Sequence, residues 1–164
     1  MNVSHSIIDK IVAYAKRSHD APLRYDNIAS FGTRSAVDQA LSRLVRDGRL
    51  RRIRRGIYEF PRQSPVLKLP VTVPADKVMQ AWARKNGVRL IPAGAWAANL
   101  LRLSTQVPAK MEYCTNGPTR RVVVDGTSVQ LKHRGPRTMN AKGLMSAAVM
   151  EALRYLGKDR VGEP

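Results

Sequence analysis

Apolar positions in the first part of the chain recur with the period of a helix. Residues 7–18 place isoleucine, valine and alanine on one face and polar residues on the other. Ser4 or Ser6 precedes this run as a natural N-cap, and Pro22 lies just beyond its end. The pattern therefore predicts an amphipathic helix that ends near Ser18.

Two further helical segments follow, separated by a tight turn. Residues 25–31 are predicted to form a short helix that Gly32 ends. Residues 34–47 carry valine, alanine and leucine at helical spacing. Thr33 is the natural N-cap of this helix, and Gly48 stands where a left-handed residue would stop it. Two helices joined in this way are typical of a helix-turn-helix.

The period changes to that of β-strands after the third helix. Residues 50–54 and 57–60 are rich in β-forming residues, and the pair Arg55-Gly56 between them is a turn signal. Apolar residues of the first strand do not alternate strictly, which predicts a bulge or a local twist. Three helices followed by a hairpin are the order of a winged helix-turn-helix, and we expect that domain over residues 1–62.

Prolines mark a boundary between two domains. Four of the fourteen residues in 61–74 are prolines, which cannot continue a helix or a central strand. We therefore expect residues 63–74 to form a stiff linker. Residues 75–164 should then form a second, small mixed α/β domain, so that the fold class predicted for the whole chain is α+β.

The second domain alternates helical and strand-like segments. Its predicted helices are 75–86, 93–103 and 141–155, and its predicted strands are 88–91, 111–115, 120–124 and 128–133. Two turn signals, Gly117-Pro118 and Asp125-Gly126, separate the last three strands. The second of these pairs is a strong hairpin signal, because its residues tolerate positive φ.

The net charge of the chain indicates the kind of partner that it binds. The 164 residues include 29 Lys and Arg against 12 Asp and Glu, which gives a formal net charge of +17. Residues 1–62 contribute +7 and residues 63–164 contribute +10. A surplus of this size indicates a polyanionic partner, because the summed field attracts phosphate groups over a Debye length or more.

The single cysteine and the first ten residues indicate the cellular compartment of the protein. Cys114 is the single cysteine, so no internal disulfide can form, which fits a reducing environment. The first ten residues lack the basic and apolar regions of a signal peptide, and no apolar run reaches the roughly 18–20 residues of a membrane span. We expect a soluble, cytoplasmic protein.

Arginine is concentrated on the third helix and the hairpin. Seven of the thirteen residues from Arg43 to Arg55 are arginine. Unpaired charge is very costly to bury, so these side chains should project toward a partner. Arginine can read guanine, and glutamine can read adenine, from a helix in the major groove. We expect contacts to duplex DNA from Thr33, Arg34, Ser35, Gln39, Ser42, Arg43, Arg46, Arg51, Arg52, Arg54 and Arg55.

Two neighbours of this set have expected roles of their own. Asp38 lies four residues after Arg34 and is expected to pair with it and orient it. Tyr25 either contacts a backbone phosphate or packs on the first helix.

Catalytic chemistry is poorly supported. His5, His19 and His133 lack metal-ligand spacing, the phosphate-binding pattern G-x-x-x-x-G-K-[ST] is absent, and the six acidic residues beyond position 62 are scattered. Cys114 and His133 could meet only through the fold, and a lone cysteine on a strand is more often a small apolar residue. We expect no enzyme activity, no metal and no cofactor.

Two stretches carry a resemblance to a known family. The run ALSRLVRDGRLRRIRRGIYEFPR (40–62) resembles the winged helix of AbiEi-type antitoxins. The segment IPAGAWAANLLRLSTQVPAK (91–110), followed by TNGPTRRV (115–122), is more diagnostic and is similar to the next domain of that family. The resemblance extends from about Ile7 to about Lys158.

This resemblance implies an antitoxin of a type IV toxin–antitoxin or abortive-infection system. Such a protein represses its own operon by binding inverted repeats in the promoter, and it counteracts a nucleotidyltransferase-like toxin, often without a stable complex. Relatives carry further helical sequence after the position of Gly157, so we expect that tail to be missing here and antitoxin function to suffer if the tail contributes to it.

The resemblance also gives the basic second domain a role, which is either to extend the DNA footprint or to meet an acidic partner. The residues concerned are Arg120, Arg121, Lys132, Arg134 and Arg137. The alternative function is a basic RNA-binding or protein-inhibiting module without sequence-specific DNA recognition.

Overall fold

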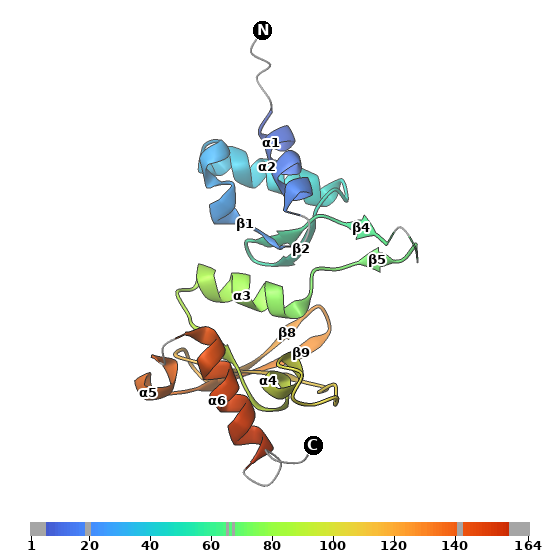
Figure 1. Cartoon of the computed structure of the whole chain (residues 1–164). Helices are drawn as coiled ribbons and strands as arrows, with labels where there is room; N and C mark the ends of the chain where they lie inside the picture. The colour runs from blue at the N-terminus through green and yellow to red at the C-terminus, as the bar shows by residue number, and fades with distance from the viewer. Residues whose placement is uncertain (1–5, 19–20, 65, 67, 141–142, 158–164) are drawn as a thin grey trace. The chain divides into compact units, whose positions relative to one another are not determined.

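The computed structural model describes residues 6–18, 21–64, 66, 68–140 and 143–157 (Figure 1). The chain divides into two compact units, Met1–Lys85 and Asn86–Pro164. Helices and strands occur in both units, so the fold class is α+β, as predicted. Within the described ranges, every helix is too short or too polar to cross a membrane.

The first unit combines helices with a small antiparallel sheet. Strand β3 is central, and the order of the sheet is β1-β3-β2. The elements are α1 (Ile7–Arg17), β1 (Leu23–Arg24), two 3-10 turns (Tyr25–Asn27 and Ala29–Phe31), α2 (Arg34–Arg46), β2 (Arg51–Arg54), β3 (Ile57–Glu59), β4 (Arg62–Gln63), β5 (Pro70–Val71) and α3 (Ala75–Lys85).

The ends of α1 and α2 confirm the predicted caps. Ser6 Oγ accepts the backbone N–H of Asp9 at 3.2 Å, and Thr33 Oγ1 accepts that of Ala36 at 3.4 Å. Each bond satisfies one of the backbone donors that a helix N-terminus leaves unpaired. Gly48 has a φ of +68°, the left-handed conformation predicted for the end of α2.

The short helix predicted over 25–31 is wrong in type. The segment forms two separate 3-10 turns on either side of Ile28, whose ψ of 1° interrupts the helical path. Asn27 Oδ1 accepts the backbone N–H of Arg24 at 3.2 Å and closes the first turn locally. Ile28 is fully buried, so burial of this side chain accompanies the break.

A core of aliphatic side chains joins the elements of the first unit. Half-buried Tyr14 and Phe31 pack against it and meet edge to face, with ring centroids 6.2 Å apart. The buried members are Ile11, Val12, Ala15, Leu23, Ile28, Val37, Ala40, Leu41, Leu44 and Leu50. They include the apolar positions that the helical spacing of α1 and α2 selects.

Residues 63–74 differ from the stiff linker that their prolines predict. Strands β4 and β5 pair as a short antiparallel ladder within this stretch. Val73 is buried, and its N–H donates to the carboxylate of Glu59 at 3.0 Å. Helix α3 packs against β3. The first unit therefore extends to Lys85, and the predicted domain boundary falls inside it.

The second unit is a four-stranded sheet with helices. The order of its strands is β6-β7-β9-β8, in which β7 and β9 are parallel and the other pairs are antiparallel. Its elements are β6 (Leu90–Pro92), α4 (Gly94–Leu100), β7 (Met111–Thr115), β8 (Arg120–Val124), β9 (Thr127–His133), α5 (Pro136–Met139) and α6 (Leu144–Leu156).

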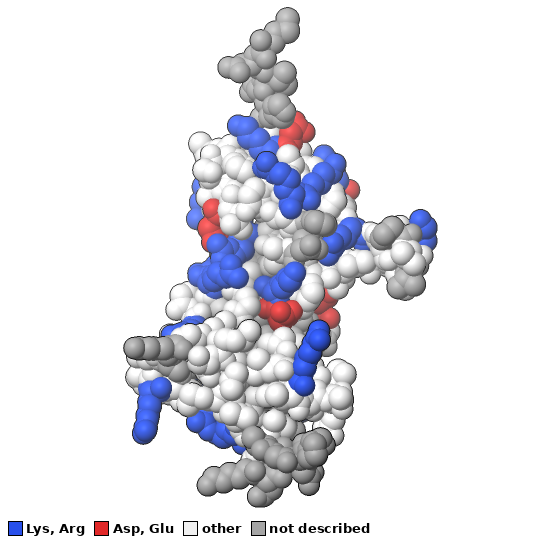
Figure 2. All heavy atoms as spheres, in the orientation of Figure 1, with Lys and Arg blue, Asp and Glu red and all other residues white. Residues whose placement is uncertain are grey.

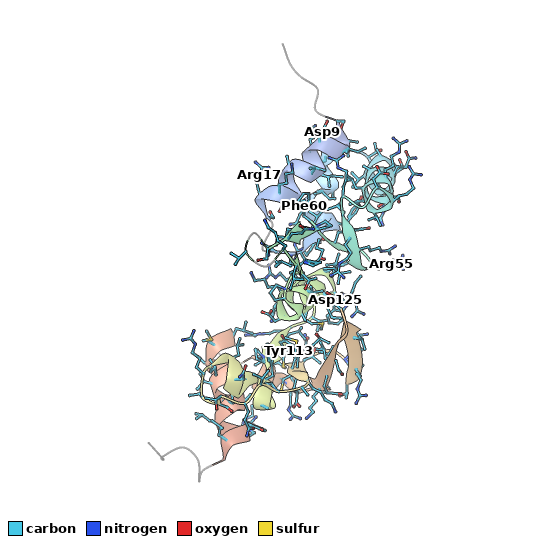
Figure 3. The ribbon with its side chains drawn as sticks, turned by 90° about the vertical axis from the view of Figure 1, so that its right-hand side faces the viewer. Asp9, Arg17, Arg55, Phe60, Tyr113 and Asp125 are labelled. Atoms are coloured by element: carbon cyan, nitrogen blue, oxygen red, sulfur yellow. The ribbon has the colours of Figure 1, made fainter. Side chains whose placement is uncertain are left out.

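Local signals in this unit match the structure well. Asp125 and Gly126 have φ values of +50° and +80° and connect β8 to β9, as the hairpin signal predicts. The helix predicted over 141–155 begins at Leu144, and positions 141–142 lie outside the described residues. Helices α4 and α6 pack side by side. Tyr113 on β7 is among the largest fully buried side chains (Figure 3).

Candidate nucleic-acid interface

Helix α2 presents one polar face to solvent. Arg34, Ser35, Gln39 and Ser42 are all exposed, whereas the opposite side of the helix is buried. These four residues lie within a half turn of the helix circumference, because one residue advances it by about 100°. Thr33, at the start of the helix, is also exposed. The structure thus brings together the predicted base-reading residues.

Arg34 is oriented by two neighbours. Its Nε lies 3.8 Å from Asp38 Oδ2, which confirms the predicted pair. Its guanidinium stacks 5.2 Å from the centre of the Tyr25 ring. Tyr25 is half-buried and packs against the core of the unit. Both contacts favour one orientation of the Arg34 side chain, but only weakly, because that side chain is 82% exposed and its ion pair is long.

The other edge of the α2 face borders α1. Gln39 and Arg43 line a shallow hollow of about 200 Å³ together with Ile7 and Ile8. Arg46, in the last turn, is exposed, and its Nε lies 3.8 Å from Asp47. An exposed ion pair of this length is weak and readily exchanged. Arg43 and Arg46 are therefore accessible to a partner.

The β2–β3 hairpin contains the predicted bulge, because its register shifts between Arg52 and Arg54. Arg52 is exposed and lies opposite Tyr58. Burial raises the pKa of Tyr58 above its usual value, while the nearby Arg52 cation lowers it and the Asp38 carboxylate raises it. Charges from the hairpin and from α2 thus lie close to the same side chain, which joins the two elements in one surface.

Arg51 is placed differently from its predicted role. Its Nε donates to Glu59 Oε1 at 2.5 Å, and Glu59 is only 3% exposed. The Arg51 side chain remains 42% exposed, but its position is set by this ion pair. Because an unpaired buried carboxylate is costly, Arg51 serves the stability of the hairpin. Its guanidinium is therefore less free to contact a partner than that of the exposed Arg52, and its predicted contact with DNA stays a prediction.

The tip of the hairpin carries charge from two parts of the chain. Arg55 is exposed and projects from the turn, whereas Phe60 packs against the core (Figure 3). Gly56 has a φ of +72°, and a Cβ at this position would lie 2.5 Å from Lys85 Nζ. The same ammonium group donates to the Arg55 carbonyl at 2.6 Å. The close approach that glycine permits here is thus to Lys85.

Lys85 is a basic residue of this surface that the sequence did not reveal. It lies thirty residues from Arg55 in the chain, at the end of α3. The sequence pattern places it beyond the expected linker, in a helix of the second domain. Arg54 is half-buried and makes contacts of its own, so it is less accessible than Arg52 or Arg55. Figure 2 shows basic side chains outnumbering acidic ones over the visible face of this unit.

The basic residues predicted in the second unit do not share one environment. Lys132 Nζ lies 2.7 Å from Glu112 Oε1, so its charge is partly offset. Arg120, Arg121 and Arg134 are exposed. Arg137, also exposed, borders a hollow of about 330 Å³ beside α6.

Cys114 and His133 do not form a nucleophilic pair. Cys114 pairs in register with Lys132, while His133 pairs with Thr115, so the two side chains point to opposite faces of the sheet. Burial, with the neighbouring Glu151 adding to it, raises the pKa of Cys114 to about 11. The His133 ring lies 3.0 Å from the Gly117 carbonyl. No group of three or more His, Cys, Asp or Glu side chains in the described part of the chain could hold a metal ion.

The geometry defines an α+β protein whose exposed polar helix adjoins a basic hairpin. Over residues 7–164 the chain matches the family described as "Family of unknown function (DUF6088)". The match covers nearly the whole chain, and the chain belongs to this family. No curated protein matches it.

Proposed function

We propose that the first unit is a winged helix-turn-helix that binds duplex DNA, with α2 in the major groove and the β2–β3 hairpin along the phosphate backbone. The order of its elements supports this proposal. A helix, a pair of short turns, a second helix and a hairpin follow one another, and β1 completes the sheet beside β3. This arrangement leaves one face of α2 exposed next to the hairpin.

The observation that carries the proposal is the shared surface of α2 and the hairpin. Arg34 and Gln39 are exposed on α2, and Arg52 and Arg55 are exposed on the hairpin. Lys85 adds its ammonium group at the hairpin tip. A surface that combines amide, hydroxyl and guanidinium groups can satisfy both base edges and phosphates. A surface that only keeps the protein in solution does not require these amide, hydroxyl and guanidinium groups to lie on neighbouring elements.

In the cell, we propose that the protein represses its own toxin–antitoxin operon. This role rests on the resemblance to AbiEi-type antitoxins. It implies a promoter with inverted repeats as the target and a nucleotidyltransferase-like toxin as the functional partner. The exposed Arg121, Arg134 and Arg137 would extend the contact with DNA or bind an acidic protein.

A binding titration tests the DNA function. The purified chain is titrated against a duplex of the sequence upstream of its own gene, a shuffled duplex and an RNA hairpin of equal length. We expect preference for the native duplex. If about five cations neutralise phosphates, the logarithm of the affinity should fall against that of salt with a slope of about −4.5. Equal affinity for native and shuffled duplexes refutes sequence-specific repression, and preference for RNA favours the alternative module.

A further inference from the structure

Helix α6 is apolar on the side that faces away from the core. Ala147, Ala148 and Ala152 are buried toward the unit. The outward side carries large apolar side chains with high exposure, namely Met145 (70%), Met150 (55%), Leu153 (40%) and Val149 (37%). A helix that is apolar all round is normally covered on every side. The outward side of α6, which we call the α6 face, therefore has the composition of an interface.

The shape of the α6 face suits a second helix of the same kind. Met145, Val149 and Leu153 follow each other at intervals of four residues and form one ridge. Ser146 and Met150 form the next row, and the small serine opens a groove between the rows. Rows of this spacing pack into the grooves of an identical helix at a crossing angle of about −50°. A contact of this type is self-complementary, as two-fold symmetry requires.

Charge also favours a second copy of the chain as the occupant. The molecule carries a net charge of +17, so two copies repel each other over most of their surfaces. The charged residues of α6 are Glu151 and Arg154, and they pair with each other. Figure 2, which views the second unit from the side of α6, shows a largely uncharged surface there. Two copies can thus meet along the ridge of Met145, Val149 and Leu153, which carries no charge, with Arg137 and Arg154 at its border.

We propose that the chain forms a two-fold symmetric dimer through the α6 face. Its four large apolar side chains expose roughly 400 Å² per copy, or roughly 800 Å² for the pair, which lies below the range of stable specific interfaces. The dimer should therefore be weak in isolation, with a dissociation constant of about 10–100 μM. Two linked half-sites on DNA would strengthen it by raising the effective concentration, a consequence that rests on the proposed function.

Sedimentation equilibrium between about 1 and 200 μM protein tests the interface without DNA. The perturbing variant is Val149→Asp. The matched control is Val107→Asp, at a valine that is 86% exposed in the loop after α4. We expect the wild type and the control to shift from monomer to dimer over this range, and Val149→Asp to remain monomeric. Met145→Glu, at the exposed start of the helix, repeats the test should Val149→Asp fold poorly.

Two results would overturn the dimer. One is a wild type that stays monomeric up to the highest concentration, which would leave the α6 face to a different protein. The other is dimerisation of Val149→Asp and Met145→Glu as strong as that of the wild type. Titration of duplexes with one or two half-sites separates this proposal from the DNA function. Dimerisation without DNA binding supports the interface and removes the DNA function, whereas non-cooperative binding to two half-sites by monomers removes the interface alone.

Discussion

Replacement of Arg51 by alanine tests whether this arginine stabilises the fold rather than binding DNA. The change removes the guanidinium from Glu59 and leaves that buried carboxylate with the Val73 N–H as its remaining described partner. Breaking a fully buried pair costs about 3–5 kcal/mol, and solvent access to the half-exposed Arg51 reduces that cost. We expect the free energy of unfolding to fall by about 2 kcal/mol.

Urea denaturation followed by circular dichroism measures this loss, with Arg52→Ala as the matched control. Arg52 lies on the same strand but is exposed, so its removal should change stability by about 0.5 kcal/mol or less. A double variant, Arg51→Met with Glu59→Met, replaces both charges by apolar groups. It should recover most of the lost stability, because the desolvation cost of the carboxylate disappears together with its partner.

DNA binding supplies the second readout for the same pair of variants. Under conditions where both are folded, Arg52→Ala should weaken binding to native and shuffled duplexes alike, because a phosphate contact carries no sequence information. Arg51→Ala should retain the affinity of the wild type. The reasoning is refuted if the two variants unfold at the same urea concentration, or if Arg51→Ala binds DNA as weakly as Arg52→Ala does.

Three further changes have defined outcomes. Gly56→Ala should cost about 1–2 kcal/mol in chemical denaturation, since it adds a clash with the α3 lysine to the strain of positive φ, whereas Gly48→Ala, with open space around it, should cost about 1 kcal/mol. Because the folded pKa of Cys114 lies at about 11, above the usual pKa of a cysteine thiol of 9.0, the folded state holds this proton more tightly. Stability should therefore fall by about 2–3 kcal/mol between pH 9 and 11, and Cys114→Ala should abolish that part of the pH dependence. Gln39→Ala should cost about 1–3 kcal/mol on the native duplex and little on a shuffled one. Equal losses on both duplexes would contradict base reading by this residue.

Local signals in the sequence predicted much of the fold. Thr33 and Gly48 bracket α2 because a capping hydroxyl and a left-handed glycine act within a few residues of chain. Asp125-Gly126 fixes the β8–β9 hairpin for the same reason. Interactions between distant residues were not visible in this way. Lys85 reaches the Arg55 carbonyl across thirty residues, and no periodicity encodes such a contact.

In two segments, contacts with distant residues decided a structure that the local sequence did not predict. Prolines in 63–74 exclude a helix, but they do not exclude the short β4–β5 ladder. That stretch belongs to the first unit because Val73 is buried and bonded to Glu59. The segment 25–31 had the composition of a helix, yet the buried Ile28 interrupts it. In each case a buried contact, rather than local propensity, decides the structure.

The hairpin shows why an arginine-rich sequence suggests more exposed arginine side chains than the folded protein has. Glu59 follows Ile57 by two residues, so both side chains lie on the buried face of β3, and the carboxylate requires a cation across the hairpin. A regular two-residue turn at Arg55-Gly56 would place Arg52 opposite Glu59. The bulge after Arg52 shifts the pairing by one residue and places Arg51 there instead. The sequence indicated a bulge but not its position. A single shift of register therefore decides which of two adjacent arginines pairs with the buried carboxylate and which remains exposed.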